Sequence, residues 1–289
     1  MQMGHAHDNV KELVEVIHAA EAVVVGAGSG LSTAAGLTYD GERFRRHFSD
    51  FIEARGFTDM YTAGFFPFPT LEEQWAYWSR HIWYNRYVEA PKDTYKKLLK
   101  LLGRKDFFVL TTNVDHQFQL AGFPKERLFY TQGDYGLWQC SVPCHNVTYD
   151  NREVVRLMVE EQRGMRVPTE LVPRCPKCGE PMSMNLRTDG TFVEDEGWHA
   201  AANRHRDYLN AHGEGRVLYL ELGVGMNTPA IVKYPLWRRT YANPQARYAC
   251  INYREAYAPA EIHGRSTLVN ADVDEALLEA LSLTDFEGA

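Results

Sequence analysis

The sequence predicts an α/β fold, a Rossmann-like parallel sheet with helices on both faces. Two observations lead to this prediction. Short apolar runs alternate along the chain with segments of helical periodicity, and the first of these runs opens directly into a glycine-rich turn. Two other regions interrupt the alternation, and they predict a helical insertion and a small cysteine-containing module added to the sheet.

The first unit begins with a helix over residues 8–20, whose apolar side chains recur at helical spacing. The segment AVVVGAGSGLSTAAGL, residues 22–37, follows as a buried strand, a glycine-rich turn and the start of a helix rich in small residues. This order is typical of the first βα unit of a nucleotide-binding fold.

Three later apolar runs predict further strands. DFFVLTTN spans 106–113, RVLYLELGVG spans 216–225, and ARYACINY spans 246–253. Helical segments such as 93–102 and 272–281 lie between or after them. Strands that alternate with helices in this way indicate a parallel sheet.

Two regions do not follow this rhythm. Residues 41–90 are rich in aromatic side chains and predict helices, whereas residues 140–180 contain cysteine pairs, prolines and little periodicity. The predicted domains follow from these interruptions. The Rossmann-like domain comprises 1–40, 91–139 and 216–289, the helical insertion comprises 41–90, and a small domain comprises 140–215.

Composition and charge narrow the function classes. The formal net charge is −7 at pH 7, whereas a nucleic-acid-binding protein would carry a basic patch or stripe. No apolar run approaches the roughly 20 residues that span a bilayer. The N-terminal segment MQMGHAHDNVKEL lacks an apolar signal-peptide region. We therefore expect a cytoplasmic protein that binds neither membranes nor nucleic acid.

Four of the five cysteines form two close pairs, Cys140 with Cys144 and Cys175 with Cys178. The pairs, CSVPC and CPKCG, match the knuckles of a four-thiolate zinc ribbon, although the first is one residue longer than the commonest spacing. Because thiolates fill all four positions of such a site, we expect the Zn²⁺ to be structural. The alternative is a set of buried free cysteines, which is our interpretation of the isolated Cys250.

Glycines and polar residues follow three of the predicted strands, at 26–30, 111–113 and 223–225. The first turn, GAGSG, offers free backbone N–H groups and a helix N-terminus to a pyrophosphate. Open α/β sheets bind ligands at the carboxyl ends of their strands. The three segments therefore predict one ligand site.

Asn113 and Asp115 are polar side chains directly after a predicted strand. They are candidates for ligand binding, although Asn and Asp are also preferred helix N-caps. We expect the neighbouring His116 to be exposed or to cap a helix rather than to act in catalysis.

The ordered series of motifs resembles the sirtuin (Sir2) family from about Val23 to Leu281. Residues 28–37 resemble its G-A-G-I-S-x-x-S/A-G-I turn, and residues 111–115 its T-Q-N-x-D segment. The cysteine pairs correspond to its zinc ribbon. Residues 223–225 fall on its G-T-S loop and residues 251–252 on its I-N pair.

The resemblance implies that the Rossmann-like domain binds NAD. Asn113 and Asp115 are implied to orient the nicotinamide ribose, Asn252 to bind the adenosine ribose and Val273 to contact adenine. The full implied cofactor set is Gly28, Ser29, Gly30, Ser32, Phe44, Arg45, Thr112, Asn113, Asp115, Gln132, Gly223, Val224, Gly225, Asn227, Asn252 and Val273.

The sequence departs from the family at three places. Residues 38–45 replace P-D-F-R, and Phe44 and Arg45 match its last two letters only with an insertion. The acyl-lysine segment V-x-F-G-E has no match within residues 185–198. The family's His-Gly is Gln132-Gly133, in the stretch YTQGDYGLWQC, which we expect to be a short polar turn that leads to Cys140.

The glutamine decides the expected chemistry. In deacylating sirtuins the histidine takes a proton from a ribose hydroxyl, and a neutral amide cannot accept it. Loss of a general base costs about 10²- to 10⁴-fold, whereas cleavage of NAD needs only orientation and dipoles near the ribose. We therefore expect ADP-ribosyl transfer, with Asn113, Asp115 and Gln132 as the catalytic residues.

The chain is similar in this respect to the macrodomain-linked class M sirtuins, which lack the histidine. That resemblance implies a protein mono-ADP-ribosyltransferase, a lipoylated acceptor similar to the glycine-cleavage H protein, and a macrodomain hydrolase that reverses the mark. Three alternatives stay open. They are a weak deacylase with another base such as a water held by Asp115, an NAD glycohydrolase, and a non-catalytic NAD- or ADP-ribose-binding module.

Overall fold

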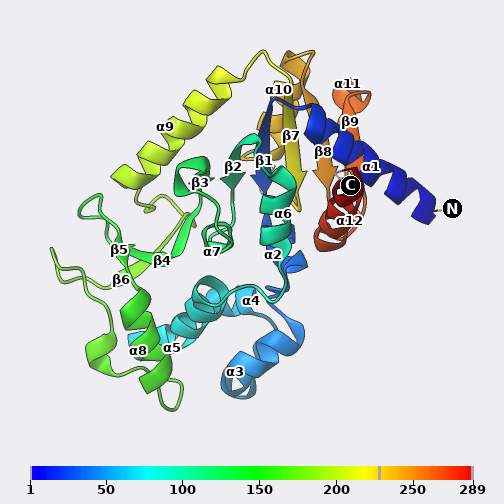
Figure 1. Ribbon diagram of the computed structural model, residues 1–289. Helices are drawn as coiled ribbons and strands as arrows, with labels where there is room; N and C mark the ends of the chain where they lie inside the picture. Colours follow the sequence, from blue (N-terminus) through cyan, green and yellow to red (C-terminus); the bar gives the residue numbers. More distant parts are fainter. Residues whose placement is uncertain (1, 227–228, 288–289) are drawn as a thin grey trace.

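The computed structural model describes residues 2–226 and 229–287, and its largest element is a six-stranded parallel sheet (Figure 1). The strand order is β3-β2-β1-β7-β8-β9. The strands are β1 (Ala22–Ala27), β2 (Asp106–Thr111), β3 (Leu128–Tyr130), β7 (Val217–Leu222), β8 (Arg247–Ile251) and β9 (Ser266–Val269). The predicted fold class is confirmed, although the sequence did not indicate the short edge strands β3 and β9.

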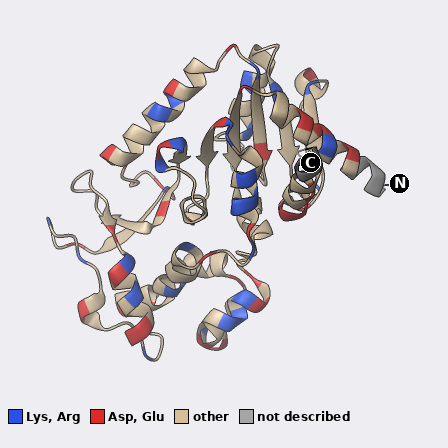
Figure 2. Cartoon of the chain, in the orientation of Figure 1, with Lys and Arg blue, Asp and Glu red and all other residues tan. Residues whose placement is uncertain are grey.

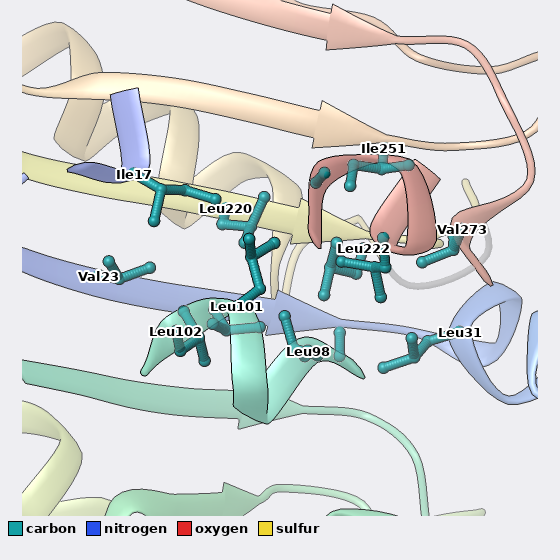
Figure 3. Close-up of a cluster of buried hydrophobic side chains, with 14 of the residues drawn as sticks. Ile17, Val23, Leu31, Leu98, Leu101, Leu102, Leu220, Leu222, Ile251 and Val273 are labelled. Carbon is teal, nitrogen blue, oxygen red and sulfur yellow. The ribbon is translucent and has the colours of Figure 1, made fainter. Parts of the chain in front are cut away.

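Helices cover both faces of this sheet. One face packs against α1 (Gln2–Ala19), α2 (Ser29–Ala34), α6 (Thr94–Leu102) and α12 (Val273–Glu287), and Figure 3 shows part of the apolar cluster between them. The other face packs against α9 (Glu196–Ala211), α10 (Lys233–Ala242) and α11 (Ala260–His263). The strands are buried on both sides, which explains their continuous apolar runs.

A second part of the molecule lies below the large sheet in Figure 1. Its antiparallel sheet has the order β5-β4-β6. The strands are β4 (Gly133–Cys140), β5 (Tyr149–Asp150) and β6 (Met182–Leu186). The helices around it are α3 (Gly41–Arg55), α4 (Met60–Gly64), α5 (Leu71–Ile82), a π-helical turn (Trp83–Tyr87) and α8 (Arg152–Glu161).

One apolar cluster joins the helices of residues 41–90 to the cysteine-containing sheet. Trp75 of α5 lies edge-on to Trp138 of β4, with ring centroids 5.1 Å apart, and Cys140 and Cys175 belong to the same cluster. The predicted separation into a helical insertion and a small domain stays a prediction. The packing places both around a shared core, whereas α9, also assigned to the small domain, packs on the large sheet.

Two local predictions were wrong in part. In the stretch from Tyr130 to Cys140 the predicted turn is limited to Thr131 and Gln132, because residues 133–140 form the central strand of the antiparallel sheet. Residues 152–161 form a helix inside the region where we saw little periodicity, and its buried residues are Val155 and Met158. Most residues of β4 are buried, whichever face of the sheet their side chains point to. The strand therefore lacks the alternation of apolar and polar residues by which sequence patterns indicate strands.

A buried ion pair holds α10 against one face of the large sheet. The Lys233 ammonium contacts the Glu221 carboxylate of β7, and Glu221 is completely buried. Tyr248 donates a second hydrogen bond to Glu221 at 2.6 Å. Cys250 lies beside them in β8, buried among apolar side chains as expected. Glu221 lies two residues before Gly223, so the pair fixes the strand end that carries this loop.

Charged residues of both signs are interspersed over the helices in Figure 2. Within the described part of the chain, no helix combines the length and apolar character that crossing a bilayer requires.

Glu221→Gln should lower the free energy of unfolding by about 3–5 kcal/mol, because the Lys233 ammonium would stay buried without its counter-charge. Urea unfolding at pH 7 measures the change. The double variant Glu221→Gln, Lys233→Met is the matched control and should recover most of the loss. Equal stability of the single variant and wild type would contradict this role of the pair.

Candidate functional site

The site lies where β1, β2 and β7 end side by side (Figure 1). The Gly30 N–H donates to the Gly223 carbonyl at 2.8 Å, and the Gly28 N–H donates to the Leu222 carbonyl at 3.0 Å. A Cβ atom on Gly30 would lie 2.7 Å from the Gly223 Cα, and Gly223 itself has a φ of 58°. Glycine is therefore required at these positions because the two loops touch through their backbones.

Asn113 joins the loop after β2 to the glycine-rich turn. Its side-chain amide donates to the Gly28 carbonyl at 3.0 Å, and the residue is 8% exposed. Asn252 does the same on the other side, where its amide donates to the Val224 carbonyl at 3.1 Å. Asn113 is not a helix N-cap, because the N-cap position of the next helix, α7 (Gln117–Leu120), is His116. Both amides thus brace the loops at the carboxyl edge of the sheet.

Asp115 is the buried carboxylate of the site. It accepts a hydrogen bond from the Ser32 hydroxyl at 2.5 Å and one from the Gln117 N–H at 3.2 Å. Burial is the largest influence on its pKa and raises it above the usual value, against the lowering effect of those two bonds. A carboxylate that is costly to keep ionised in the folded protein is typical of a functional group.

Tyr95 is a site residue that sequence reasoning missed. Its hydroxyl is 3.0 Å from the Ser32 hydroxyl, which in turn donates to Asp115. Tyr95 stands in the first turn of α6, where its spacing with Leu98 and Leu102 gives only the pattern of a core position. The three side chains form a chain of hydrogen bonds that orients the Asp115 carboxylate. Nothing in the sequence distinguishes Tyr95 from a residue that only packs in the core.

Gln132 lies at the joint between the two sheets. The Thr131 N–H donates to the Thr111 carbonyl at 3.0 Å, and the Arg187 N–H donates to the Gln132 carbonyl at 2.9 Å. Gly133 has a φ of 97°, and a Cβ there would lie 1.8 Å from the Asn185 carbonyl oxygen. The backbone on both sides of Gln132 is therefore fixed, while its half-buried side-chain amide has no hydrogen-bond partner within the described residues.

The segment 185–198, in which no family motif was found, nevertheless reaches the site. Arg187 pairs with Glu194 at 2.5 Å, and its guanidinium lies 4.4 Å from the Phe192 ring centroid and 5.4 Å from that of Trp198. The loop after β6 is thus held together around one arginine beside Gln132. The side chains of this loop differ from the family pattern, but β6 pairs with β4 and so brings the loop beside Gln132.

Some predicted cofactor residues lie elsewhere. Phe44 is 2% exposed inside the core below the large sheet, and Arg45 is exposed on α3. Arg43 is the arginine of this segment that points inward, and it donates to the Thr38 carbonyl at 3.0 Å and to Asn85 at 2.9 Å. Val273 packs in the apolar core beneath the site (Figure 3).

The remaining predicted cofactor residues lie directly after the strands of the site. Ser29 is the first residue of α2, Thr112 lies on the loop that follows β2, and Val224 and Gly225 lie on the loop that follows β7. Asn227 lies outside the described residues.

The four paired cysteines come together in the antiparallel-sheet region, and their sulfur atoms all lie within 4.8 Å of one another. The Cys140 and Cys178 sulfurs are 3.5 Å apart, and those of Cys144 and Cys175 are 3.7 Å apart. These separations are too long for disulfides, whose sulfurs lie about 2.05 Å apart. They match the edge of a tetrahedron around an ion with metal–sulfur bonds of about 2.3 Å. The cluster could therefore hold a metal ion.

Comparison with known proteins gives two relatives. No protein-family model matches the chain. It is 39% identical over 266 residues to the protein ADP-ribosyltransferase of Staphylococcus aureus strain Mu50, a match that covers 92% of this chain and 84% of that protein. It is 34% identical over 241 residues to the "Probable bifunctional ADP-ribose hydrolase/ADP-ribosyltransferase" of Fusarium oxysporum f. sp. cubense. That match covers 76% of this chain but only 38% of the fungal protein.

Solved Sir2 structures share the fold. The structure of Sir2Tm bound to a propionylated peptide superposes with a TM-score of 0.60 at 18% identity, and the match covers 95% of this chain and 98% of that one. A complex of Sir2 with a p53 peptide and NAD+ gives a TM-score of 0.56 at 17% identity, with 96% and 98% coverage. At these identities the similarity establishes the fold.

Asp115→Asn should stabilise the folded protein at neutral pH by about 0.5–2 kcal/mol, because it removes a buried charge. The raised pKa of Asp115 determines in which direction the stability changes with pH. The folded state holds the Asp115 proton more tightly than the unfolded state, so this residue makes wild-type stability fall as pH rises through that pKa. The advantage of the variant should disappear below about pH 4. Urea unfolding between pH 4 and 8 tests this, and a variant less stable than wild type at pH 7 would contradict it.

Cys140→Ser should lose the metal and loosen the core shared by Trp75 and Trp138, because a four-ligand site contributes directly to folding. Elemental analysis should find one ion per chain in the wild type, and near-ultraviolet circular dichroism should report the tryptophans. The matched control is Cys250→Ala, which removes a cysteine outside the cluster and should keep the ion. Metal binding by Cys140→Ser at wild-type stoichiometry would show that the cluster is not the site.

Proposed function

The chain belongs to the family of sirtuin-fold protein ADP-ribosyltransferases, and from this we propose that it transfers ADP-ribose from NAD to a protein acceptor and releases nicotinamide. The observation that carries the proposal is the composition of the site. Asn113 and Asp115 lie buried at the carboxyl edge of the sheet. Gln132, whose side-chain amide has no partner among the described residues, follows Thr131, whose N–H bonds to the end of β2.

The loops supply the binding groups for NAD. The closely packed glycine loops leave open space beside Gly225 at the carboxyl edge of the sheet, which suits the pyrophosphate. We place the nicotinamide ribose at Asn113 and Asp115 and the adenosine ribose at Asn252. Phe44, Arg45 and Val273 have no part in this arrangement unless the segments that carry them move.

Cleavage of the bond between C1′ of the ribose and the nicotinamide nitrogen builds positive charge on the sugar. The buried carboxylate of Asp115, oriented by Ser32 and Tyr95, stabilises that charge in a poorly solvated site. The acceptor nucleophile then bonds to C1′ as nicotinamide leaves. Gln132 can orient a ribose hydroxyl or the acceptor by hydrogen bonds, but it cannot take the proton that deacylation requires.

We propose that the ion in the cysteine cluster is Zn²⁺ with a structural role. Four thiolates in a tetrahedral arrangement suit this ion, and no ligand position stays open for a substrate. We also propose a cytoplasmic location, because thiols stay reduced there and can hold the ion.

For the acceptor we propose a lipoylated carrier protein similar to the glycine-cleavage H protein, which is the class implied by the sequence resemblance. A macrodomain-type hydrolase would reverse the mark. The printed name of the fungal relative, which joins an ADP-ribose hydrolase to an ADP-ribosyltransferase, supports that pairing of activities.

The proposal is tested by incubating the protein with adenylate-labelled NAD, a clarified lysate and a purified lipoylated carrier. Label should appear on protein, and Asn113→Ala should reduce it by about 10²-fold or more because the ribose loses its orientation. The carrier without lipoate is the matched acceptor control. Free ADP-ribose as the sole product would indicate a glycohydrolase, and O-acyl-ADP-ribose formed from an acylated peptide would indicate a deacylase.

A further inference from the structure

Asp134 is a buried carboxylate next to the site that the proposed chemistry leaves without a role. It is 3% exposed and stands two residues after Gln132. One oxygen accepts from Arg86 Nε at 2.6 Å and from the Gly136 N–H at 2.7 Å. The other accepts from His116 Nδ1 at 2.7 Å. Both oxygens of the carboxylate are therefore occupied by protein donors.

The partners of Asp134 come from different parts of the chain. Arg86 belongs to the π-helical turn at the end of α5, and His116 to the loop after β2. A Cβ on Gly136 would lie 2.9 Å from Arg86 Nε, so glycine at this position makes room for the guanidinium. A π-helical turn is rare and often marks a functional site. Asp134 thus links the helices of residues 41–90 to the loop that carries Asp115.

His116 is held in an unfavourable conformation to make this contact. It has a φ of 60°, a region that residues with a Cβ seldom adopt, and its side chain makes no capping bond to α7. The imidazole instead turns to Asp134 and is 22% exposed. His116 stands at the N-cap position of α7, in agreement with one of the two expectations, but its side chain pairs with a buried carboxylate and does not cap the helix. Observed strain of this kind points to a functional constraint.

The electrostatics identify Asp134 as a fixed charge. Burial alone would raise the pKa of its carboxyl group, but the hydrogen bond from His116 and the charge of Arg86 outweigh burial and leave the pKa below its usual value. Asp134 is therefore ionised at neutral pH. A permanently charged group surrounded by protein donors is suited to holding its neighbours in place.

The two residues that Asp134 joins stand beside the proposed catalytic residues. His116 directly follows Asp115, and Asp134 follows Gln132 after one glycine. A second bond runs parallel to the link, from the Tyr135 N–H to the Val114 carbonyl at 2.9 Å. A change in the His116–Asp134 distance would therefore move the carboxylate on one side of the ribose relative to the amide on the other.

We propose that Asp134 is a positioning residue for NAD cleavage, which fixes Asp115 and Gln132 relative to each other through His116 and couples both to the helical region through Arg86. The inference rests on the proposed function, since it takes the ribose to lie between Asp115 and Gln132.

The test compares His116→Asn with His116→Ala. An asparagine amide can donate from nearly the place of Nδ1 and tolerates positive φ, whereas alanine does neither. His116→Ala should lower kcat for nicotinamide release, with clarified lysate as acceptor source, by about 10- to 100-fold, the cost of a displacement of about 1 Å. The KM for NAD should change less than about threefold, because the glycine loops are untouched. His116→Asn should keep at least about a third of kcat.

Hydrogen exchange gives a second readout that needs no turnover. Amides of residues 113–117 and 131–136 should exchange faster together in His116→Ala, and at the wild-type rate in His116→Asn. If His116→Ala matches wild type in kcat and in exchange, Asp134 positions nothing. If His116→Asn loses as much kcat as His116→Ala, the imidazole itself is required and the positioning role is wrong. If the wild-type protein releases no nicotinamide, the proposed function is wrong. The hydrogen-exchange rates then still show whether the His116–Asp134 contact holds the two segments together.

Discussion

The parallel pairing of β1 with both neighbours is the constraint on which the site depends. In this register Ala27 pairs with Thr111 of β2 on one side and with Leu222 of β7 on the other. The three strands therefore end at the same level, and the loops that follow them meet. A slip of one residue would move every side chain of a strand to the opposite face. Because each face packs against a different set of helices, the packing fixes the position of the loops.

The loops at this edge are held by contacts that also limit what the site can do. Asn113 and Asn252 use their side-chain amides on loop carbonyls, while Asp115 is buried against Ser32. The fold thus keeps the Asp115 carboxylate buried, where its charged form is unfavourable, and orients it with hydrogen bonds. A site built for orientation and charge stabilisation, with an amide in place of a base, suits cleavage of NAD better than proton transfer.

Sequence patterns predicted the sheet because its central strands are buried on both faces and read as continuous apolar runs. They predicted the cysteine cluster because the ligand spacing itself is diagnostic. They failed for residues 133–140, because this buried strand contains two glycines, Asp134 and Gln139 and so shows neither a continuous apolar run nor an alternation.

The sequence could not indicate contacts that depend on tertiary structure. Tyr95 has the spacing of a core residue, and its role appears only when α6 packs beside Ser32. His116 and Asp134 are far from Arg86 in the chain, and only the packing of three segments brings them together. On α3 it is Arg43, not the expected Arg45, that points inward and bonds to the Thr38 carbonyl.

We propose that NAD lies across these loops with its nicotinamide ribose between Asp115 and Gln132. The most direct test is a crystal structure with a carbocyclic NAD analogue, which cannot lose nicotinamide. We expect ribose hydroxyls within about 3 Å of the side chains of Asn113 and Gln132, and nicotinamide near Asp115. An analogue bound with its adenosine half at these residues, or outside the carboxyl edge of the large sheet, would contradict it.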